Sequence, residues 1–222
     1  MEIVKTDIIL PEPGRSRGKL AFVLDNVLSA EECSKFIDEM ESEEFEPALL
    51  NTQLVVDHRK CLRRLVFDEE KADWIFERIK KYLPEEWEEV GLGKCPIVGL
   101  NERLSVLKYS AGDYFKPHED GVYIRFEKPE RSFITIQLYL NEGFEGGNTT
   151  FIDAASYYER GWRTRLPLRQ SKHVSVVPKT GRILVFEHKI LHEGSLLKSG
   201  VKHSVRTDVM YRMNNKCEDV DQ

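Results

Sequence analysis

The sequence predicts a mainly β domain (class α+β), of the sandwich or barrel type, with two helices ahead of the strands. From residue 97 onward, short β-rich runs follow one another at 97–109, 131–141, 149–152, 172–178, 181–187 and 203–212. Turn signals separate these runs, notably Gly112-Asp113, Gly146-Gly147 and Lys179-Thr180-Gly181. Many short strands bounded by such turns are typical of a β-sandwich or a β-barrel.

Length and composition predict one domain. The chain has 222 residues, of which 41% are hydrophobic and 32% are charged, so it can form a packed core. We expect a single domain over 1–222, with a flexible arm (1–18), a helical support region (19–96) and the β core (97–212). The arm is expected because prolines and glycines interrupt any regular pattern between residues 11 and 18.

The first helix is expected over residues 30–42, after a short strand within 19–28. Ser29, with Glu32 three residues later, forms the pattern of a capping box. The apolar side chains of this segment recur on one helical face, namely Cys33, Phe36, Ile37 and Met40.

The second helix is expected over residues 69–83, after a strand at 61–67. Asp68 precedes it as the cap, Pro84 ends it, and its apolar side comprises Trp74, Ile75, Ile79 and Tyr82. Because both helices precede the β core, we expect them to cover one outer face of a sheet. The acidic run at 85–90 is expected to be a solvated surface.

Charge and cysteine content restrict the class of protein. The formal net charge of −5 argues against a broad nucleic-acid interface. The four cysteines form no C-x-x-C pair, which disfavours a disulfide scaffold and favours reduced thiols. Since the sequence has no signal-peptide pattern and no membrane-spanning run, we expect a cytoplasmic or nuclear protein without a membrane partner.

Residues 118–120 read His-Glu-Asp, a spacing that suits a metal site. On a strand, His118 and Asp120 would point the same way, because side chains repeat every second residue. Two histidines and one carboxylate form the facial triad of non-haem iron(II) oxygenases. The alternative is a polar turn, since an H-x-D tripeptide is a weak signal by itself.

A third ligand has to come from the other histidines. His192 lies at the edge of a predicted strand, just after the apolar run 182–190, where a pocket would open. His188 is its rival, four residues earlier. His58 and His173 lie in charged segments and are expected to be exposed polar residues.

Alternating polar residues mark the last predicted strand. Lys202, Ser204, Arg206 and Asp208 share one face of it. If this face is buried, its cations need anionic partners, because burying an unpaired charge costs on the order of several kcal/mol. A bound dicarboxylate would supply them. Two alternatives are that the face is exposed to solvent, or that Arg206 and Asp208 form internal ion pairs.

Three further segments are candidates for the surroundings of a site. Arg131, Thr135, Gln137 and Tyr139 alternate along one strand and either line the pocket or face outward. The long segment 153–172 is rich in aromatic residues and arginine, so it either covers the site, grips an acidic peptide or packs on the barrel. The segment 46–64 is expected near the same mouth.

Six short motifs occur in a fixed order in the β core. They are YSAG (109–112), HED (118–120), YLN (139–141), GGNTTF (146–151), HEG (192–194) and GVK (200–202). Their order and spacing resemble the Fe(II)- and 2-oxoglutarate-dependent oxygenases of the prolyl 4-hydroxylase-like type. The predicted helix at 30–42 also resembles the N-terminal helix of that family, so the resemblance covers most of the chain.

The resemblance implies a double-stranded β-helix, related to the jelly-roll and cupin folds, with the N-terminal helices buttressing one sheet. It implies iron ligation by His118, Asp120 and His192. It matches Lys202 to the residue that binds the distal carboxylate of 2-oxoglutarate, and Tyr109 to a tyrosine that lines the cosubstrate pocket. Other branches place two basic residues four apart on this strand, one for each carboxylate of 2-oxoglutarate. Lys202 and Arg206 fit that scheme, and which of them takes the distal carboxylate stays open here.

The resemblance also implies an activity. It implies Fe(II), 2-oxoglutarate and dioxygen, with ascorbate as a supporting reductant, in a dioxygenase that hydroxylates a C–H bond and releases succinate and carbon dioxide. Because Asp120 is present, we expect hydroxylation rather than halogenation. The expected substrate is a protein side chain such as proline. The alternatives are a free amino acid or another small molecule, or an inactive barrel that serves as a binding module.

Overall fold

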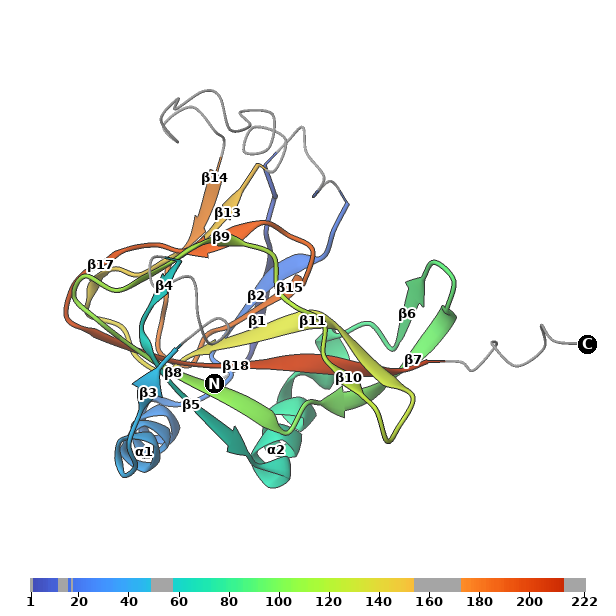
Figure 1. Ribbon diagram of the computed structural model, residues 1–222, viewed down its shortest axis with the longest axis horizontal. Helices are drawn as coiled ribbons and strands as arrows, with labels where there is room; N and C mark the ends of the chain where they lie inside the picture. The colour runs from blue at the N-terminus through green and yellow to red at the C-terminus, as the bar shows by residue number, and fades with distance from the viewer. Residues whose placement is uncertain (1, 12–15, 17, 49–57, 154–172, 214–222) are drawn as a thin grey trace, which may run out of the picture.

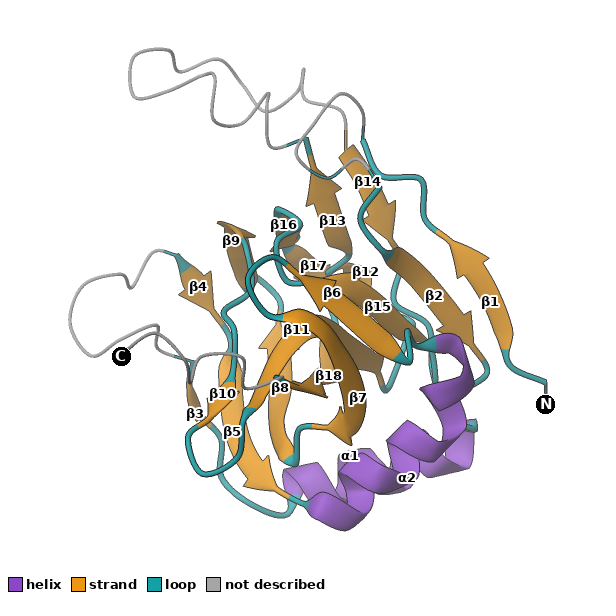
Figure 2. Cartoon of the chain, turned by 90° about the vertical axis from the view of Figure 1, so that its right-hand side faces the viewer, coloured by secondary structure: helices purple, strands orange, loops and turns teal. Residues whose placement is uncertain are grey.

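Strands dominate the protein (Figure 1). The computed structural model describes residues 2–11, 16, 18–48, 58–153 and 173–213. Figure 2 shows both helices gathered on one side of the molecule, against the strands.

The larger sheet contains eleven strands, eight of them in the order β1–β2–β15–β11–β18–β8–β5–β3. In that order the strands are β1 (Val4–Asp7), β2 (Ala21–Asp25), β15 (Ile183–Glu187), β11 (Glu130–Tyr139), β18 (Val201–Arg212), β8 (Arg103–Ser110), β5 (Leu62–Phe67) and β3 (Glu46–Pro47). The other three lie beside this path, with β10 (Ile124–Arg125) on β11, and β7 (Gly93–Leu100) between β18 and β6 (Glu86–Glu89).

The smaller sheet contains five strands in the order β14–β13–β16–β9–β4. They are β14 (His173–Val176), β13 (Thr149–Ile152), β16 (His192–Gly194), β9 (Tyr114–His118) and β4 (Arg59–Lys60). A separate pair is formed by β12 (Glu145–Gly146) and β17 (Leu197–Ser199).

Both helices begin where their caps predict. Helix α1 (Ala30–Glu41) follows Ser29, whose hydroxyl accepts from the Glu32 backbone N–H at 3.2 Å while the Glu32 carboxylate accepts from the Ser29 N–H at 2.8 Å. Helix α2 (Glu69–Ile79) follows Asp68, whose carboxylate accepts from the Lys71 N–H at 2.8 Å. The 3₁₀ turn η1 (Lys80–Tyr82) then ends the second helix.

The main core lies between the helices and the outer face of the larger sheet, which confirms the predicted buttress. Apolar side chains of both helices pack there against alternate residues of β8, β11 and β18, including Phe36, Met40, Ile75, Ile79, Leu104, Val106, Ile134, Ile136, Val205 and Val209. Each such side chain contributes about 1.5–3 kcal/mol when fully buried. This layer therefore fixes three strands whose opposite faces remain available for a site.

Two expectations for the N-terminal half differ from the structure. The segment 1–18 is not an arm throughout, because Val4–Asp7 form β1 and pair with β2; its prolines lie beyond that strand. The strands expected within 19–28 and at 61–67 are present as β2 and β5, and both belong to the larger sheet. The acidic run forms β6, and its Trp87 ring stacks on Phe133 at 5.7 Å between centroids, since alternation turns one face of the strand inward.

The cysteines agree with the predicted reduced thiols where they are described. Cys33, Cys61 and Cys95 are free and buried, and Cys217 lies outside the described residues. Among the helices of the described segments, none is both long enough and apolar enough to cross a membrane.

Candidate active site

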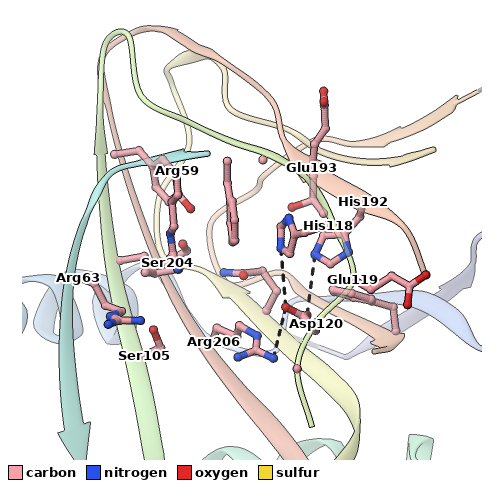
Figure 3. Close-up of a pocket in the computed structure, with 18 of the residues that line it drawn as sticks. Arg59, Arg63, Ser105, His118, Glu119, Asp120, His192, Glu193, Ser204 and Arg206 are labelled. Carbon is pink, nitrogen blue, oxygen red and sulfur yellow. Dashed lines mark ion pairs between the residues drawn. The ribbon is translucent and has the colours of Figure 1, made fainter. Parts of the chain in front are cut away.

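Two histidines and one aspartate converge on one point (Figure 3). His118 ends β9 and His192 begins β16, and these two residues are paired across the strands. Asp120 lies two residues after His118, and each histidine Nε2 lies 3.8 Å from one of its carboxylate oxygens. One ligand atom from each of the three residues lies within 4.8 Å of the others, and no other His, Cys, Asp or Glu group in the described residues does this.

The histidines direct Nε2 to the centre because Nδ1 is bonded elsewhere. Nδ1 of His118 lies 2.8 Å from the Lys116 carbonyl oxygen, and Nδ1 of His192 lies 2.9 Å from that of Ile190. A carbonyl oxygen only accepts, so Nδ1 carries the proton and Nε2 keeps its lone pair. Burial, reinforced by His192, lowers the pKa of His118 to about 3, so this imidazole is neutral at neutral pH.

Asp120 is held as a carboxylate although it is buried. Burial by itself raises a carboxyl pKa, but Arg206 and the two neighbouring histidines outweigh burial and lower the pKa of Asp120. The Thr135 hydroxyl donates to its Oδ2 at 2.6 Å, and Nη2 of Arg206 lies 3.4 Å from its Oδ1. The carboxylate is therefore fixed in both charge and orientation.

His188 lies behind this carboxylate. Its Nδ1 is 2.9 Å from Thr135 Oγ1, and its Nε2 is 2.8 Å from Ser132 Oγ, which accepts from the Tyr123 backbone N–H at 2.9 Å. Because Thr135 donates to Asp120, it accepts from Nδ1–H of His188, whose Nε2 then accepts from Ser132. Burial lowers the pKa of His188 to about 3, in keeping with this neutral, fully bonded ring.

These contacts distinguish the two candidates for the third ligand. The structure brings His192 to Asp120 and His118, while His188 supports the site through Thr135. The polar-turn alternative for residues 118–120 is wrong, because the His118 and Asp120 side chains meet a histidine that follows 72 residues after the aspartate.

Lys202 is buried in the same cavity. Its Nζ donates to the Gly147 carbonyl oxygen at 2.6 Å and lies 5.1 Å and 5.3 Å from the ring centroids of Tyr109 and Tyr139. Burial lowers the pKa of Lys202 to about 8. Among the described residues, no carboxylate forms an ion pair with it. An ammonium has three donors, so those not bonded to Gly147 are available for an anionic ligand.

Glycine is required where this lysine is anchored. Gly147 has φ +67°, and a Cβ there would lie 2.9 Å from Leu197 Cδ1 and 3.4 Å from Lys202 Cδ. The Gly-Gly turn predicted at 146–147 thus allows the backbone carbonyl to approach the buried ammonium.

Arg206 lies on the same face of β18 but has carboxylate partners. Its Nη2 is 3.0 Å from Asp208 Oδ1 and 3.4 Å from Asp120 Oδ1. The internal-pair alternative therefore holds for Arg206. The solvent-exposed alternative is wrong for this face, because Lys202, Ser204 and Asp208 are at most 5% exposed.

A cavity of about 210 Å³ joins these groups. It is lined by residues of both sheets, among them Tyr109, His118, Asp120, Gln137, Thr149, His192, Lys202, Ser204 and Arg206. Nε2 of Gln137 and Oγ of Ser204 are buried there without a hydrogen-bond partner. Since Thr135 and Gln137 both face the site, the outward alternative for the polar face of β11 is wrong.

Sequence reasoning missed three arginines that line the same cavity, Arg59, Arg63 and Arg103. The segment 46–64 was expected near the mouth, and alternation along β5 was the available signal for Arg63.

His58 was expected to be exposed, but pairing of β4 with β9 brings its ring within 6.3 Å of the His118 ring, centroid to centroid. His173 is exposed as predicted, and residues 154–172 lie outside the described part of the chain.

Known proteins with this arrangement provide an independent comparison. Residues 104–208 match the family model of the 2OG-Fe(II) oxygenase superfamily. Two curated relatives from Arabidopsis thaliana are probable prolyl 4-hydroxylase 8, 26% identical over 182 residues, and probable prolyl 4-hydroxylase 3, 28% identical over 171 residues. Each match covers 75% of this chain, and the chain spans only 57% of the length of either relative.

Solved structures match over almost the whole chain. A prolyl-4-hydroxylase of Pseudomonas putida has a TM-score of 0.57 at 17% identity, over 90% of this chain and 96% of that one. The viral collagen prolyl hydroxylase of Paramecium Bursaria Chlorella virus-1 has a TM-score of 0.55 at 20% identity, over 90% and 100%. At these identities the likeness establishes the fold, which confirms the predicted double-stranded β-helix.

The family-model match and the shared fold make this chain similar to the 2OG-Fe(II) oxygenase superfamily. The curated relatives and the structural neighbours that it resembles include prolyl 4-hydroxylases.

Proposed function

We propose that this chain is an Fe(II)- and 2-oxoglutarate-dependent dioxygenase that hydroxylates a C–H bond of a protein side chain such as proline, with release of succinate and carbon dioxide. One observation carries the proposal. The triad of His118, Asp120 and His192 shares a small cavity with Lys202, a buried cation that has no carboxylate partner among the described residues.

The chemistry of the donor set fits iron. Two neutral imidazoles and one carboxylate are the ligands of the non-haem iron(II) triad. Both histidines are pre-oriented by their bonds to backbone carbonyls, and Asp120 is pre-oriented by Thr135. Such outer contacts fix the ring orientation and raise the basicity of a ligand.

The cavity also fits 2-oxoglutarate. We assign the distal carboxylate to Lys202 rather than Arg206, because the guanidinium is already paired with Asp208 and Asp120. Tyr109 would contact the cosubstrate from beside the ammonium. The buried Ser204 hydroxyl, which has no partner, offers a further polar contact.

Each protein group then has a defined part in the reaction. When bound, iron(II) supplies the activation of dioxygen coupled to oxidative decarboxylation of 2-oxoglutarate to succinate and carbon dioxide, with transfer of one oxygen atom to substrate. Lys202 orients the cosubstrate, Arg206 offsets the negative charge of Asp120, and Thr135 fixes that carboxylate. The buried walls exclude bulk water from the centre.

The assay for this function is succinate release from 2-oxoglutarate by purified protein with Fe(II) and ascorbate in air. Wild type and Lys80→Gln, a change on the exposed turn η1, are expected to release succinate, whereas His192→Ala is not. Calorimetry with Mn(II) should detect 2-oxoglutarate binding, and its absence would refute the proposal. Mass spectrometry of proline-containing peptides and of free amino acids, each tested for a gain of one oxygen atom, separates the two substrate classes.

A further inference from the structure

The cavity has a strongly basic side that the metal and 2-oxoglutarate do not require. Arg59 of β4, Arg63 of β5 and Arg103 of β8 line it together with the triad. Arg206 has two carboxylate partners, but none of these three arginines forms an ion pair with a carboxylate in the described residues. Three cations brought together in this way favour an anionic ligand.

Carboxylates lie near two of the arginines without forming an ion pair with them: Glu46 acts to raise the pKa of Arg63, and Arg103 acts to lower the pKa of Asp208. Nε of Arg59 donates to Cys61 Sγ at 3.2 Å, and its guanidinium lies 4.5 Å from the Phe115 ring centroid. Burial lowers the pKa of Arg63, and repulsion from Arg59 and Arg103 lowers it further. An anion held at this point would relieve that repulsion.

Acidic residues of the cavity lie on its other side. Figure 3 shows Glu119 and Glu193 beside the histidines, and Arg59 and Arg63 across the cavity from them. Glu119 lies 4.0 Å from Lys189 Nζ, and Glu193 accepts from the Ser195 hydroxyl at 2.9 Å. Glu119 and Glu193 therefore have partners on the far side of the cavity and form no ion pair with Arg59 or Arg63.

The basic side continues into an exposed apolar surface. In the pairing of β5 with β8, Arg63 lies opposite Leu107, Leu65 opposite Ser105, and Phe67 opposite Arg103. Paired residues of antiparallel strands share a face, and Ser105 and Leu107 line the cavity. Leu65 and Phe67 thus point to the cavity side, where they are 38% and 68% exposed.

We propose that this β5–β8 surface, made of Arg63, Leu65, Phe67 and Arg103, is the substrate-docking surface, and that its occupant is an acidic peptide segment. A carboxylate side chain of the peptide binds Arg63 and Arg103, and adjacent apolar groups cover Leu65 and Phe67. A small molecule confined to the cavity would leave those two side chains uncovered, and the net charge of −5 disfavours nucleic acid. The role of the peptide as substrate rests on the proposed function.

The test compares two fluorescein-labelled nine-residue peptides, each with one central proline and either three glutamates or three glutamines. Binding is measured by anisotropy with Mn(II) and 2-oxoglutarate present. Wild type is expected to bind the glutamate peptide at least tenfold more tightly. The ratio should fall below threefold in the double variant Arg63→Gln/Arg103→Gln, which removes two positive charges from this surface. It should persist in Lys80→Gln, which removes one positive charge elsewhere.

Measurements on wild type keep the test independent of how the double variant folds. Raising the salt concentration from 50 to 500 mM should weaken binding of the glutamate peptide several-fold more than binding of the glutamine peptide, because salt screens exposed charges. Equal affinity for the two peptides, no binding of either at 1 mM, or stronger displacement by a ten-residue oligothymidylate would overturn the proposal.

Failure of this inference is distinguishable from failure of the proposed function. Calorimetric binding of 2-oxoglutarate together with equal peptide affinities would remove the docking surface and leave the oxygenase assignment intact. A tenfold preference for the glutamate peptide without 2-oxoglutarate binding would instead refute the oxygenase assignment and leave the docking surface intact. The two outcomes are separable because Arg63 and Arg103 are neither metal ligands nor contacts of Lys202.

Discussion

Replacing Lys202 with methionine is expected to stabilise the protein while abolishing its cosubstrate binding. Lys202 is 5% exposed, and burial lowers its pKa from 10.5 to about 8. The folded protein therefore holds this proton less tightly than the unfolded chain does. Below pH 8 the penalty for burying the charge is fully present, and it is relieved as the pH rises from 8 to 10.5.

The magnitude follows from these two values. At pH 7 the penalty is about 3 kcal/mol, and at pH 9.5 it is roughly 2 kcal/mol smaller. Methionine also forfeits the hydrogen bond to the Gly147 carbonyl, a loss of about 1 kcal/mol. The Lys202→Met variant should therefore be about 2 kcal/mol more stable than wild type at pH 7 and nearly equal to it at pH 9.5.

The assay is urea unfolding of the metal-free protein at the two pH values, with the free energy obtained by linear extrapolation. Lys80→Met is the matched control, because it makes the same substitution at an exposed lysine on η1, outside the cavity. In calorimetry with Mn(II), Lys202→Met should lose 2-oxoglutarate affinity by roughly 30-fold or more. A stability difference for Lys202→Met that does not change with pH would refute the reasoning.

Three further changes address the triad and its support. His192→Ala should abolish Mn(II) binding in calorimetry, whereas His188→Ala should weaken it by about 10–100-fold, as expected for an outer partner; equal losses would contradict the assignment of the third ligand. Thr135→Val removes the donor to Asp120 without changing the shape of the side chain, so Mn(II) affinity should fall by about tenfold while the far-ultraviolet circular dichroism stays unchanged. Gly147→Ala places a methyl group against β17 and the lysine, so the melting temperature and the 2-oxoglutarate affinity should both fall, and unchanged affinity would argue against the anchoring of Lys202 at this turn.

Local signals in the sequence were sufficient for the helices and for part of the site. Ser29 with Glu32, and Asp68 alone, located both helix starts because caps depend on residues within one turn. The H-x-D spacing selected two side chains that do meet in the site, but β9 ends at His118, so the strand alternation expected for the pair does not extend to Asp120.

On β11, an irregularity of the backbone made the prediction from strict side-chain alternation fail. Ladder pairing shifts between Ser132 and Ile134, so strict alternation from residue 131 fails at that point. As a result, Ser132 and Thr135 both contact His188, although they lie an odd number of residues apart. The supporting role of His188 depends on this bulge, which no residue type in the segment signals.

The difference between Lys202 and Arg206 could be derived only in part from the strand that carries both. The two cations share one face of β18, and Asp208 on that same face offers Arg206 one partner. Distant segments supply the rest: Asp120 follows β9 and reaches Arg206, while the turn at Gly147 brings Lys202 only a carbonyl oxygen. Because an unpaired buried cation is more costly than a paired one, the same strand carries one charge that stabilises Asp120 and one that is suited to an incoming carboxylate.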